Sequence, residues 1–293
     1  MTRPDGVPSF LPRLPRRRPD SHKGDFGRAL LIGGSQGMAG AIALTGMAAA
    51  RSGAGLVKLA TSAACQATVA SFEPSLMTVS LPADAHGKIA GSAWSQLSEM
   101  AREATVVACG PGLGRSHELV ELVGWLYKSL TQPLVVDADA LNALAQQPDI
   151  LAKPGGPRIF TPHPGEFGRL IGQDSISANQ REKLARRFAE QTGGVVVLKG
   201  HHTVVTDGRS LSLNSTGNPG MATGGTGDVL TGIITALVGQ HLSPLDAARL
   251  GVYVHGLAGD LAAAELGEVS MIASDLIKHL PRAWQQVGEG PEA

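Results

Sequence analysis

The chain has 293 residues, 43% of them hydrophobic, and its 25 Lys and Arg balance its 25 Asp and Glu. This composition excludes a bulk electrostatic attraction to nucleic acid or to a membrane surface, and it predicts a globular protein with a large core. The two cysteines, Cys65 and Cys109, indicate neither a disulfide framework nor a zinc site, so we expect a reducing, cytoplasmic setting.

The first 23 residues form a segment rich in proline and arginine, with Arg16, Arg17 and Arg18 in succession. No apolar stretch of signal-peptide length follows them, so we expect neither a signal peptide nor a spanning helix here. We interpret residues 1–23 as a flexible arm, 24–280 as one catalytic domain and 281–293 as a tail.

Apolar runs typical of buried strands alternate with helical stretches after the arm. The predicted order is strand 29–33, helix 39–52, strand 56–61, helix near 63–71, strand 76–81, strand 105–110, helix from 116, strand 133–140, strand 158–161, a helix after 166 and strand 195–200. Residues 202–214 predict a hairpin with an Asp-Gly turn, and residues 225–280 are expected to be helical. The pattern predicts an α/β three-layer sandwich whose mostly parallel sheet is covered by helices on both faces.

Polar and glycine-rich motifs follow four of these strands directly. They are GPGLG at 110–114, DADALN at 137–142, TPHPGE at 161–166 and KG at 199–200. Because ligands of open α/β sheets bind beyond the carboxyl ends of the strands, we expect one cleft to collect these motifs.

The run NSTGNPGMATGGTGDVLTG, residues 214–232, is the strongest functional signal in the chain. Glycines let backbone N–H groups converge on an anion, and a helix starting near Gly225 adds the positive end of its dipole. Asp228 in the first turn is a candidate base toward an attacking hydroxyl, with the N–H groups of Gly225, Thr226 and Gly227 around the developing charge. The alternative is an ordinary helix start capped by Thr226 or Asp228.

Two further motifs offer candidate polar ligands. Asp137 and Asp139 could bind Mg²⁺ through water or support the cleft by hydrogen bonds, while Asp139 could instead cap the next helix. His163 lies between two prolines at a strand end and is a candidate for contact with a ligand. Glu166 either caps the following helix or reaches metal-bound water.

Lys199 and the glycine-rich segment 33–41 complete the candidate cleft. Lys199 could meet phosphate or ribose, with Gly200 allowing the chain close to a base, or it could be a solvent-facing lysine. In GGSQGMAGA, Gly40 and Ala41 could line the substrate cleft, or their small size could permit close helix packing.

Together these motifs resemble the ADP/ATP-dependent NAD(P)H-hydrate dehydratase family of the ribokinase-like superfamily, over residues 24 to about 280. The matching segments are GDFGRALLIGGSQGMAGA, ACGPGLG, VVDADALN, FTPHPGEF, VLKGHHTVV and NSTGNPGMATGGTGDVLTG. The resemblance implies repair of the S epimer of hydrated NADH or NADPH, driven by conversion of ADP to AMP, or of ATP to ADP, through phosphorylation of the ring hydroxyl.

The resemblance also implies roles for single residues. Asp228 would be the catalytic base. Nucleotide contacts would come from Lys199, Gly200, His201, His202, Thr203 and Gly227, and substrate contacts from Ala41, Gly114, His163 and Asp228. Mg²⁺ would neutralise the nucleotide phosphates, with ligands unknown and Asp137 and Glu166 as weak candidates. An epimerase for the hydrate is expected on a separate chain, and a homotetramer or other homo-oligomer is expected.

Two other functions stay open at this stage. A ribokinase-like kinase of a hydroxymethylpyrimidine or a sugar would use the same loop and Asp228, and would release a stable phosphorylated product. A nucleotide-binding sensor without catalysis is disfavoured by the intact GTGD. We favour ADP as the donor, although no residue decides between ADP and ATP or between the two hydrates.

Overall fold

A computed structural model describes residues 6–288 and residue 290. One nine-stranded sheet runs through it in the order β3-β2-β1-β4-β5-β6-β7-β8-β9. The strands are β1 Arg28–Ile32, β2 Leu56–Ser62, β3 Met77–Leu81, β4 Val106–Cys109, β5 Leu134–Val136, β6 Arg158–Phe160, β7 Val195–Leu198, β8 Val204–Thr206 and β9 Leu211–Leu213. Neighbours from β3 to β7 pair in parallel, and β8 and β9 pair antiparallel, which confirms the predicted parallel sheet and hairpin.

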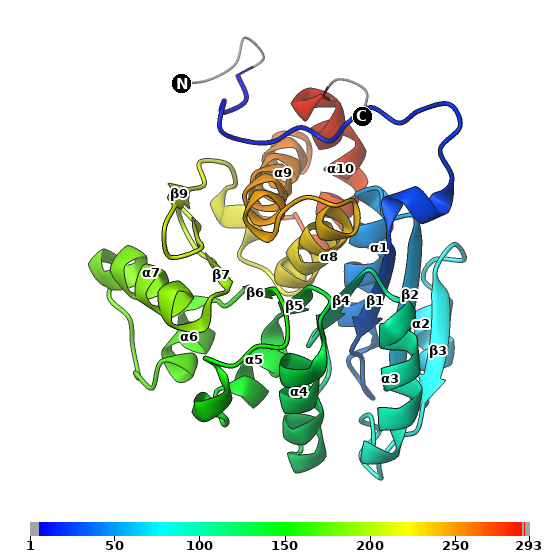
Figure 1. Ribbon diagram of the computed structural model, residues 1–293. Helices are drawn as coiled ribbons and strands as arrows, with labels where there is room; N and C mark the ends of the chain where they lie inside the picture. The colour runs from blue at the N-terminus through cyan, green and yellow to red at the C-terminus, as the bar shows by residue number, and fades with distance from the viewer. Residues whose placement is uncertain (1–5, 289, 291–293) are drawn as a thin grey trace.

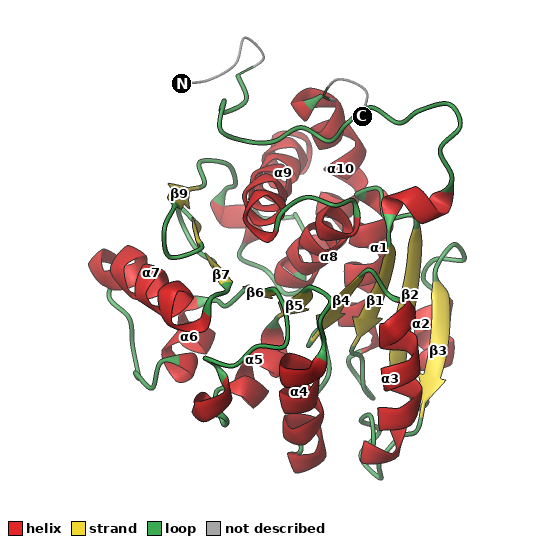
Figure 2. Ribbon diagram, viewed as in Figure 1, coloured by secondary structure: helices red, strands yellow, loops and turns green. Residues whose placement is uncertain are grey.

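Helices cover both faces of the sheet, and Figures 1 and 2 show the three layers. One face carries α1 Ala39–Arg51, α2 Gln66–Ala70, α8 Thr226–Gly239, α9 Pro244–Leu266 and α10 Ala273–Val287; the other carries α3 Trp94–Glu103, α4 His117–Ser129, α5 Ala138–Leu144, α6 Pro164–Leu170 and α7 Arg181–Thr192. Short 3₁₀ helices lie at Lys23–Phe26, Gly91–Ala93, Pro148–Ile150, Ala178–Gln180 and Pro219–Met221.

The strands are apolar on both sides because each side faces a helical layer. In β1, Ala29 and Leu31 join the core under α1 and α8, whereas Leu30 and Ile32 join the core under α3 to α7. Successive side chains of a strand point to opposite faces, so a continuous apolar run is what a doubly covered sheet requires.

The helices differ in detail from the expected ranges. The stretch predicted as helical from 225 to 280 contains three helices, and α10 continues through Pro281 to Val287, so the predicted domain boundary at 280 falls inside a helix. The helix expected near 63–71 is the five-residue α2. The helix expected after Glu166 is two helices, and the first already begins at Pro164.

The N-terminal arm crosses the molecule beside α9 and α10, close to the C-terminal end (Figure 1). Val7 and Leu11 are buried, and Leu14 accepts a hydrogen bond from Gly290 N–H at 2.7 Å. Residues 1–5 of the predicted arm, and residues 289 and 291–293 of the predicted tail, lie outside the described residues. No helix among the described residues is long and apolar enough to cross a membrane.

Candidate active site

The N-terminus of α8 is an open, positively polarised helix end. Gly225 is its N-cap, with φ +91°, and no side chain caps the helix, so capping by Thr226 or Asp228 does not occur. The Thr226 hydroxyl instead donates to the carbonyls of Met221 and Thr223, at 3.0 and 3.1 Å. First-turn N–H groups have no partner within a helix, so this end is suited to hold an anion.

Lys199, directly after β7, adds a full positive charge beside this helix end. A Cβ at position 227 would lie 3.1 Å from the Lys199 Nζ, so the absence of a side chain at Gly227 leaves the ammonium next to the first turn. An ammonium and a positively polarised helix end both attract negative charge. Their position side by side therefore suits a phosphate-sized anion.

Buried carboxylates hold Lys199 in place. Its Nζ lies 3.0 Å from Asp137 Oδ1 and 3.9 Å from Glu166 Oε2. Burial opposes the charge of the ammonium, but these carboxylates outweigh that effect and raise the pKa of Lys199. Asp137, only 1% exposed, also accepts a hydrogen bond from the Thr231 hydroxyl of α8 at 2.8 Å. Asp137 thus ties the end of β5 to both β7 and α8.

Asp228 has the pKa of a base that works near neutral pH. Burial, followed by the negative charge of Asp137, raises its pKa from 3.8 to about 7, against the opposing effect of Lys199. A carboxylate with this pKa accepts a proton more readily than an ordinary aspartate does at the same pH. Raised values of this kind cluster at functional sites.

His163 and Glu166 cap α6 reciprocally. The His163 Nδ1 accepts from the N–H groups of Gly165 and Glu166, and the Glu166 Oε2 accepts from the His163 N–H at 2.8 Å. An Nδ1 that accepts hydrogen bonds belongs to the neutral imidazole, in agreement with burial lowering the pKa of His163. Its Nε2 lies 3.5 Å from Glu166 Oε1, and its side chain is 52% exposed. His163 is therefore oriented at the sheet edge and accessible.

Asp139 supports the neighbouring turn instead of capping a helix, since it lies inside α5. Its carboxylate accepts from the Gly114 N–H at 2.9 Å and from the Arg115 Nε at 3.2 Å. Ala41 contacts the same turn, because a Cβ at Gly112 would lie 3.1 Å from the Ala41 Cβ. Ala41 at the start of α1 thus lies beside the turn after β4 that contains Gly114.

A cavity of about 570 Å³ lies between the first turn of α8, the segment after β7 and the segment after β9. All six predicted nucleotide contacts line it, namely Lys199, Gly200, His201, His202, Thr203 and Gly227. Asp228, Ala41, Gly114 and His163 are not part of this lining. The lining therefore includes the predicted nucleotide contacts and omits the predicted substrate contacts, and the two sets meet at Gly227 and Asp228 in the first turn of α8.

Two residues near this cavity were absent from the sequence prediction. His255 of α9 lies 2.8 Å through its Nε2 from the Thr226 carbonyl, and burial lowers its pKa to about 4, so it donates as a neutral imidazole. Arg181 donates to the carbonyls of Leu198, Lys199 and His201. Neither residue stands in a motif, so only the fold reveals that they brace the cavity walls.

No group of three or more His, Cys, Asp or Glu side chains suited to a metal ion occurs among the described residues. Asp137 and Glu166, the weak metal candidates, both face Lys199. A metal ion at this site would therefore depend mainly on oxygen atoms brought by a ligand.

A doubly covered α/β sheet with an open helix N-terminus, a lysine and a near-neutral carboxylate at one edge is typical of proteins that bind phosphate groups. Solved structures share this fold. A Bacillus subtilis ADP/ATP-dependent NAD(P)H-hydrate dehydratase, co-crystallised with ATP/Mg²⁺, is 31% identical with TM-score 0.79, over 96% of this chain and 100% of that chain. A ribokinase-like superfamily protein of Enterococcus faecalis V583 is 29% identical with TM-score 0.79, over 95% and 93% of the two chains.

The NAD(P)H-hydrate dehydratase family model matches residues 29–282. A bifunctional NAD(P)H-hydrate repair enzyme of Moorella thermoacetica is 45% identical over 283 residues, which is 96% of this chain and 53% of that protein. The chain belongs to the NAD(P)H-hydrate dehydratase family, which confirms the predicted family and the ribokinase-like fold. It spans about half the length of the curated relatives it matches.

Proposed function

We propose that this chain dehydrates hydrated NADH or NADPH of the S configuration at the expense of ADP or ATP, and so restores the reduced cofactor. The observation that carries the proposal is the position of Asp228, with a pKa of about 7, in the first turn of α8 beside Lys199. The family of the chain supplies the substrate class.

The chemistry follows from the poor leaving ability of hydroxide. Asp228 takes the proton of the ring hydroxyl, whose oxygen bonds to the terminal phosphorus of the nucleotide as the bond to the remaining nucleotide breaks. The N–H groups of Gly225, Thr226 and Gly227 and the Lys199 ammonium stabilise the charge that develops on the phosphoryl oxygens. The ring then expels phosphate, and the adjacent ring carbon gives up a proton to water as the double bond re-forms.

The two sides of the α8 terminus suit the two substrates. The adenine nucleotide would occupy the 570 Å³ cavity, with its terminal phosphate at Lys199 and Gly227. The hydrated cofactor would approach from the other side, where Ala41, Gly114 and His163 lie near the sheet edge. Such an arrangement puts the hydroxyl and the phosphate in line at Asp228.

Mg²⁺ would neutralise nucleotide phosphate charge in this site and would be held mainly by the phosphate oxygens. Asp137 and Glu166 are buried carboxylates that pair with Lys199. The preference for ADP, the cytoplasmic location, the homo-oligomer and an epimerase on a separate chain are further parts of this proposal.

Recovery of absorbance at 340 nm tests the activity, because only the restored dihydronicotinamide ring absorbs there. Purified protein with Mg²⁺ is added to hydrated NADH and hydrated NADPH, with ADP or ATP in parallel. We expect recovery with at least one donor, and the faster donor is the preferred one. Consumption of nucleotide without recovery, together with a stable phosphorylated product, would instead support the small-molecule kinase.

A further inference from the structure

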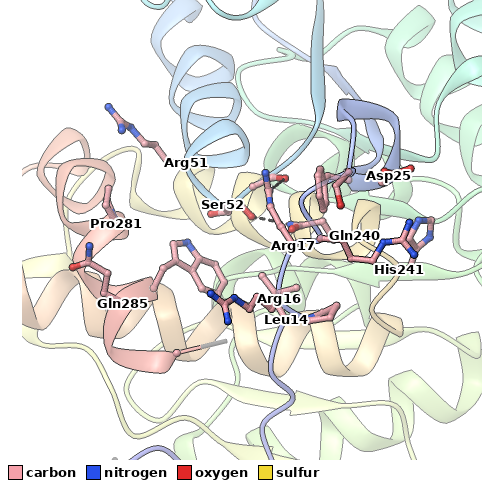
Figure 3. A pocket seen from close by; sticks show the side chains of 17 residues that line it. Leu14, Arg16, Arg17, Asp25, Arg51, Ser52, Gln240, His241, Pro281 and Gln285 are labelled. Carbon is pink, nitrogen blue, oxygen red and sulfur yellow. Dashed lines mark hydrogen bonds between the residues drawn. The ribbon is translucent and has the colours of Figure 1, made fainter. Parts of the chain in front are cut away.

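A second cavity, of about 740 Å³, lies at the opposite ends of the two helices that begin at the candidate active site. Its wall includes Arg51 and Ser52, where α1 ends, and Gln240 and His241, just after α8. The N-terminal arm and α10 close the other sides, as Figure 3 shows for Leu14, Arg16, Arg17, Pro281 and Gln285. It shares no lining residue with the 570 Å³ cavity.

This cavity is strongly cationic, although the charges of the chain as a whole balance. Arg16, Arg17, Arg18 and Arg51 line it, and among the described lining residues Asp25 alone is acidic. Arg17 is held by the Phe26 ring, 3.7 Å away, and by the Gly53 carbonyl, while Arg18 pairs with Asp20.

Within the part of the chain that the structure describes, the Arg16 and Arg51 side chains form no hydrogen bond or ion pair, although the charge of Arg51 acts on Glu73. Two guanidinium groups at one cavity without a bound carboxylate favour an anion, and their planar donors suit phosphate oxygens in particular.

Two buried polar atoms in the same wall have no hydrogen-bond partner. They are the hydroxyl of Ser52, a residue only 2% exposed, and the Trp284 indole nitrogen. Buried donors are nearly always satisfied in folded proteins, so two orphans at one cavity are informative. Trp284 also supplies aromatic surface on which a planar ring can stack.

We propose that this cavity is a second ligand site, which binds an anion carrying a planar ring, the chemistry of a nucleoside phosphate. Arg16 holds the phosphate, Arg51, whose guanidinium points outward in Figure 3, turns inward from the rim to join it, and Trp284 contacts the ring. The Ser52 hydroxyl is a donor to the ligand once its side chain rotates toward it.

Trp284 can report binding directly. The chain has three tryptophans, and the other two, Trp94 and Trp125, pack together with centroids 5.9 Å apart on α3 and α4, across the sheet. In the full-length Trp94→Phe/Trp125→Phe variant, Trp284 is the sole indole. We expect AMP to change its fluorescence saturably, with a Kd below about 1 mM. Adenosine and inorganic phosphate, titrated separately, are each expected to bind at least about tenfold more weakly than AMP.

Matched variants locate the bound probe. Arg16→Ala/Arg51→Ala is expected to weaken AMP binding at least about tenfold. Arg186→Ala/Arg209→Ala, which removes two exposed arginines elsewhere, and Lys199→Ala in the candidate active site are expected to leave it unchanged. The thermal unfolding midpoint of each variant is measured to verify that it is folded at the temperature of the titration.

Three results would overturn the proposal. The first is the absence of any saturable change with AMP. The second is equal affinity for AMP and for inorganic phosphate, which would remove the ring contact. The third is a response that survives Arg16→Ala/Arg51→Ala but disappears in Lys199→Ala, which would place the ligand in the other cavity.

Discussion

The two ends of α1 and α8 show how one helix pair can serve two kinds of surface. At their N-terminal ends, glycine-rich loops expose backbone N–H groups, and the single lysine there is balanced by Asp137 and Glu166. At their C-terminal ends the cavity is charged by arginine side chains, three of them from the N-terminal arm. The first end is built from backbone that only the fold positions, whereas the second is built from side chains on an added segment. A reaction that needs a fixed geometry is therefore expected at the N-terminal ends of α1 and α8.

Removing the Asp228 carboxylate is the largest expected perturbation of the active end. We expect Asp228→Asn to lower kcat by on the order of 100-fold or more, because a general base is lost while the anion-binding N–H groups remain. Turnover by the 340 nm assay and nucleotide affinity by calorimetry measure the two effects separately. Near-normal turnover would remove Asp228 from the role of base.

Packing between α1 and α8 tests whether the two ends share one rigid helix pair. A Cβ at Gly232 of α8 would collide with the Thr45 carbonyl of α1 and would lie 2.9 Å from the Ala48 Cβ. We expect Gly232→Ala to lower the free energy of unfolding by about 2–3 kcal/mol through overpacking. Gly40→Ala in α1, where a Cβ meets nothing within 4 Å, is the control and should be neutral or stabilising. Equal effects of both changes in urea unfolding would contradict this packing.

The raised pKa of Asp228 predicts a pH-dependent gain in stability for Asp228→Asn. The folded state keeps this proton up to about pH 7, whereas the value of 3.8 describes an unperturbed carboxyl. Ionisation in the folded state therefore costs stability, and the cost grows from about pH 4 until it levels off above about pH 7.

We thus expect Asp228→Asn to be more stable than the parent by about 4 kcal/mol at pH 8, because the pKa is raised from 3.8 to about 7, with the difference vanishing below about pH 4. Urea unfolding across this range measures it. A difference that does not change with pH would mean that charge burial is not its cause.

The smallest of the expected effects is the loss of ligand affinity in Lys199→Ala. Loss of the ammonium beside Gly227 should weaken ADP binding about tenfold, or about 1.4 kcal/mol. Lys183→Ala, on the exposed side of α7, is the matched control. Calorimetry with ADP and Mg²⁺ measures the affinity of both variants. An unchanged affinity of the Lys199→Ala variant would contradict a contact between Lys199 and phosphate. A thermal melt accompanies it, because Asp137 is left buried without its ammonium partner.

Most of the fold could be predicted from the order of the motifs along the chain. Apolar runs such as 195–198 identify strands covered on both faces, and the Asp-Gly turn at 207–208 identifies the hairpin. Helix boundaries were less accurate, because α10 passes through Pro281 and its last turns are held by packing of Ala283 and Val287. The local sequence pattern around Pro281 does not indicate this tertiary packing.

The sequence by itself determined the family, the parallel sheet and the loop that ends in Asp228, since these depend on residue order and on glycine where side chains would block an anion. Only the tertiary structure decided that Asp137 and Glu166 face Lys199, that His255 supports Thr226, and that Arg16 and Arg51 line one cavity. Each of these relations joins residues distant in sequence. Burial and charge act through space, so the ionisation of Asp228 could be predicted only after the chain had folded around it.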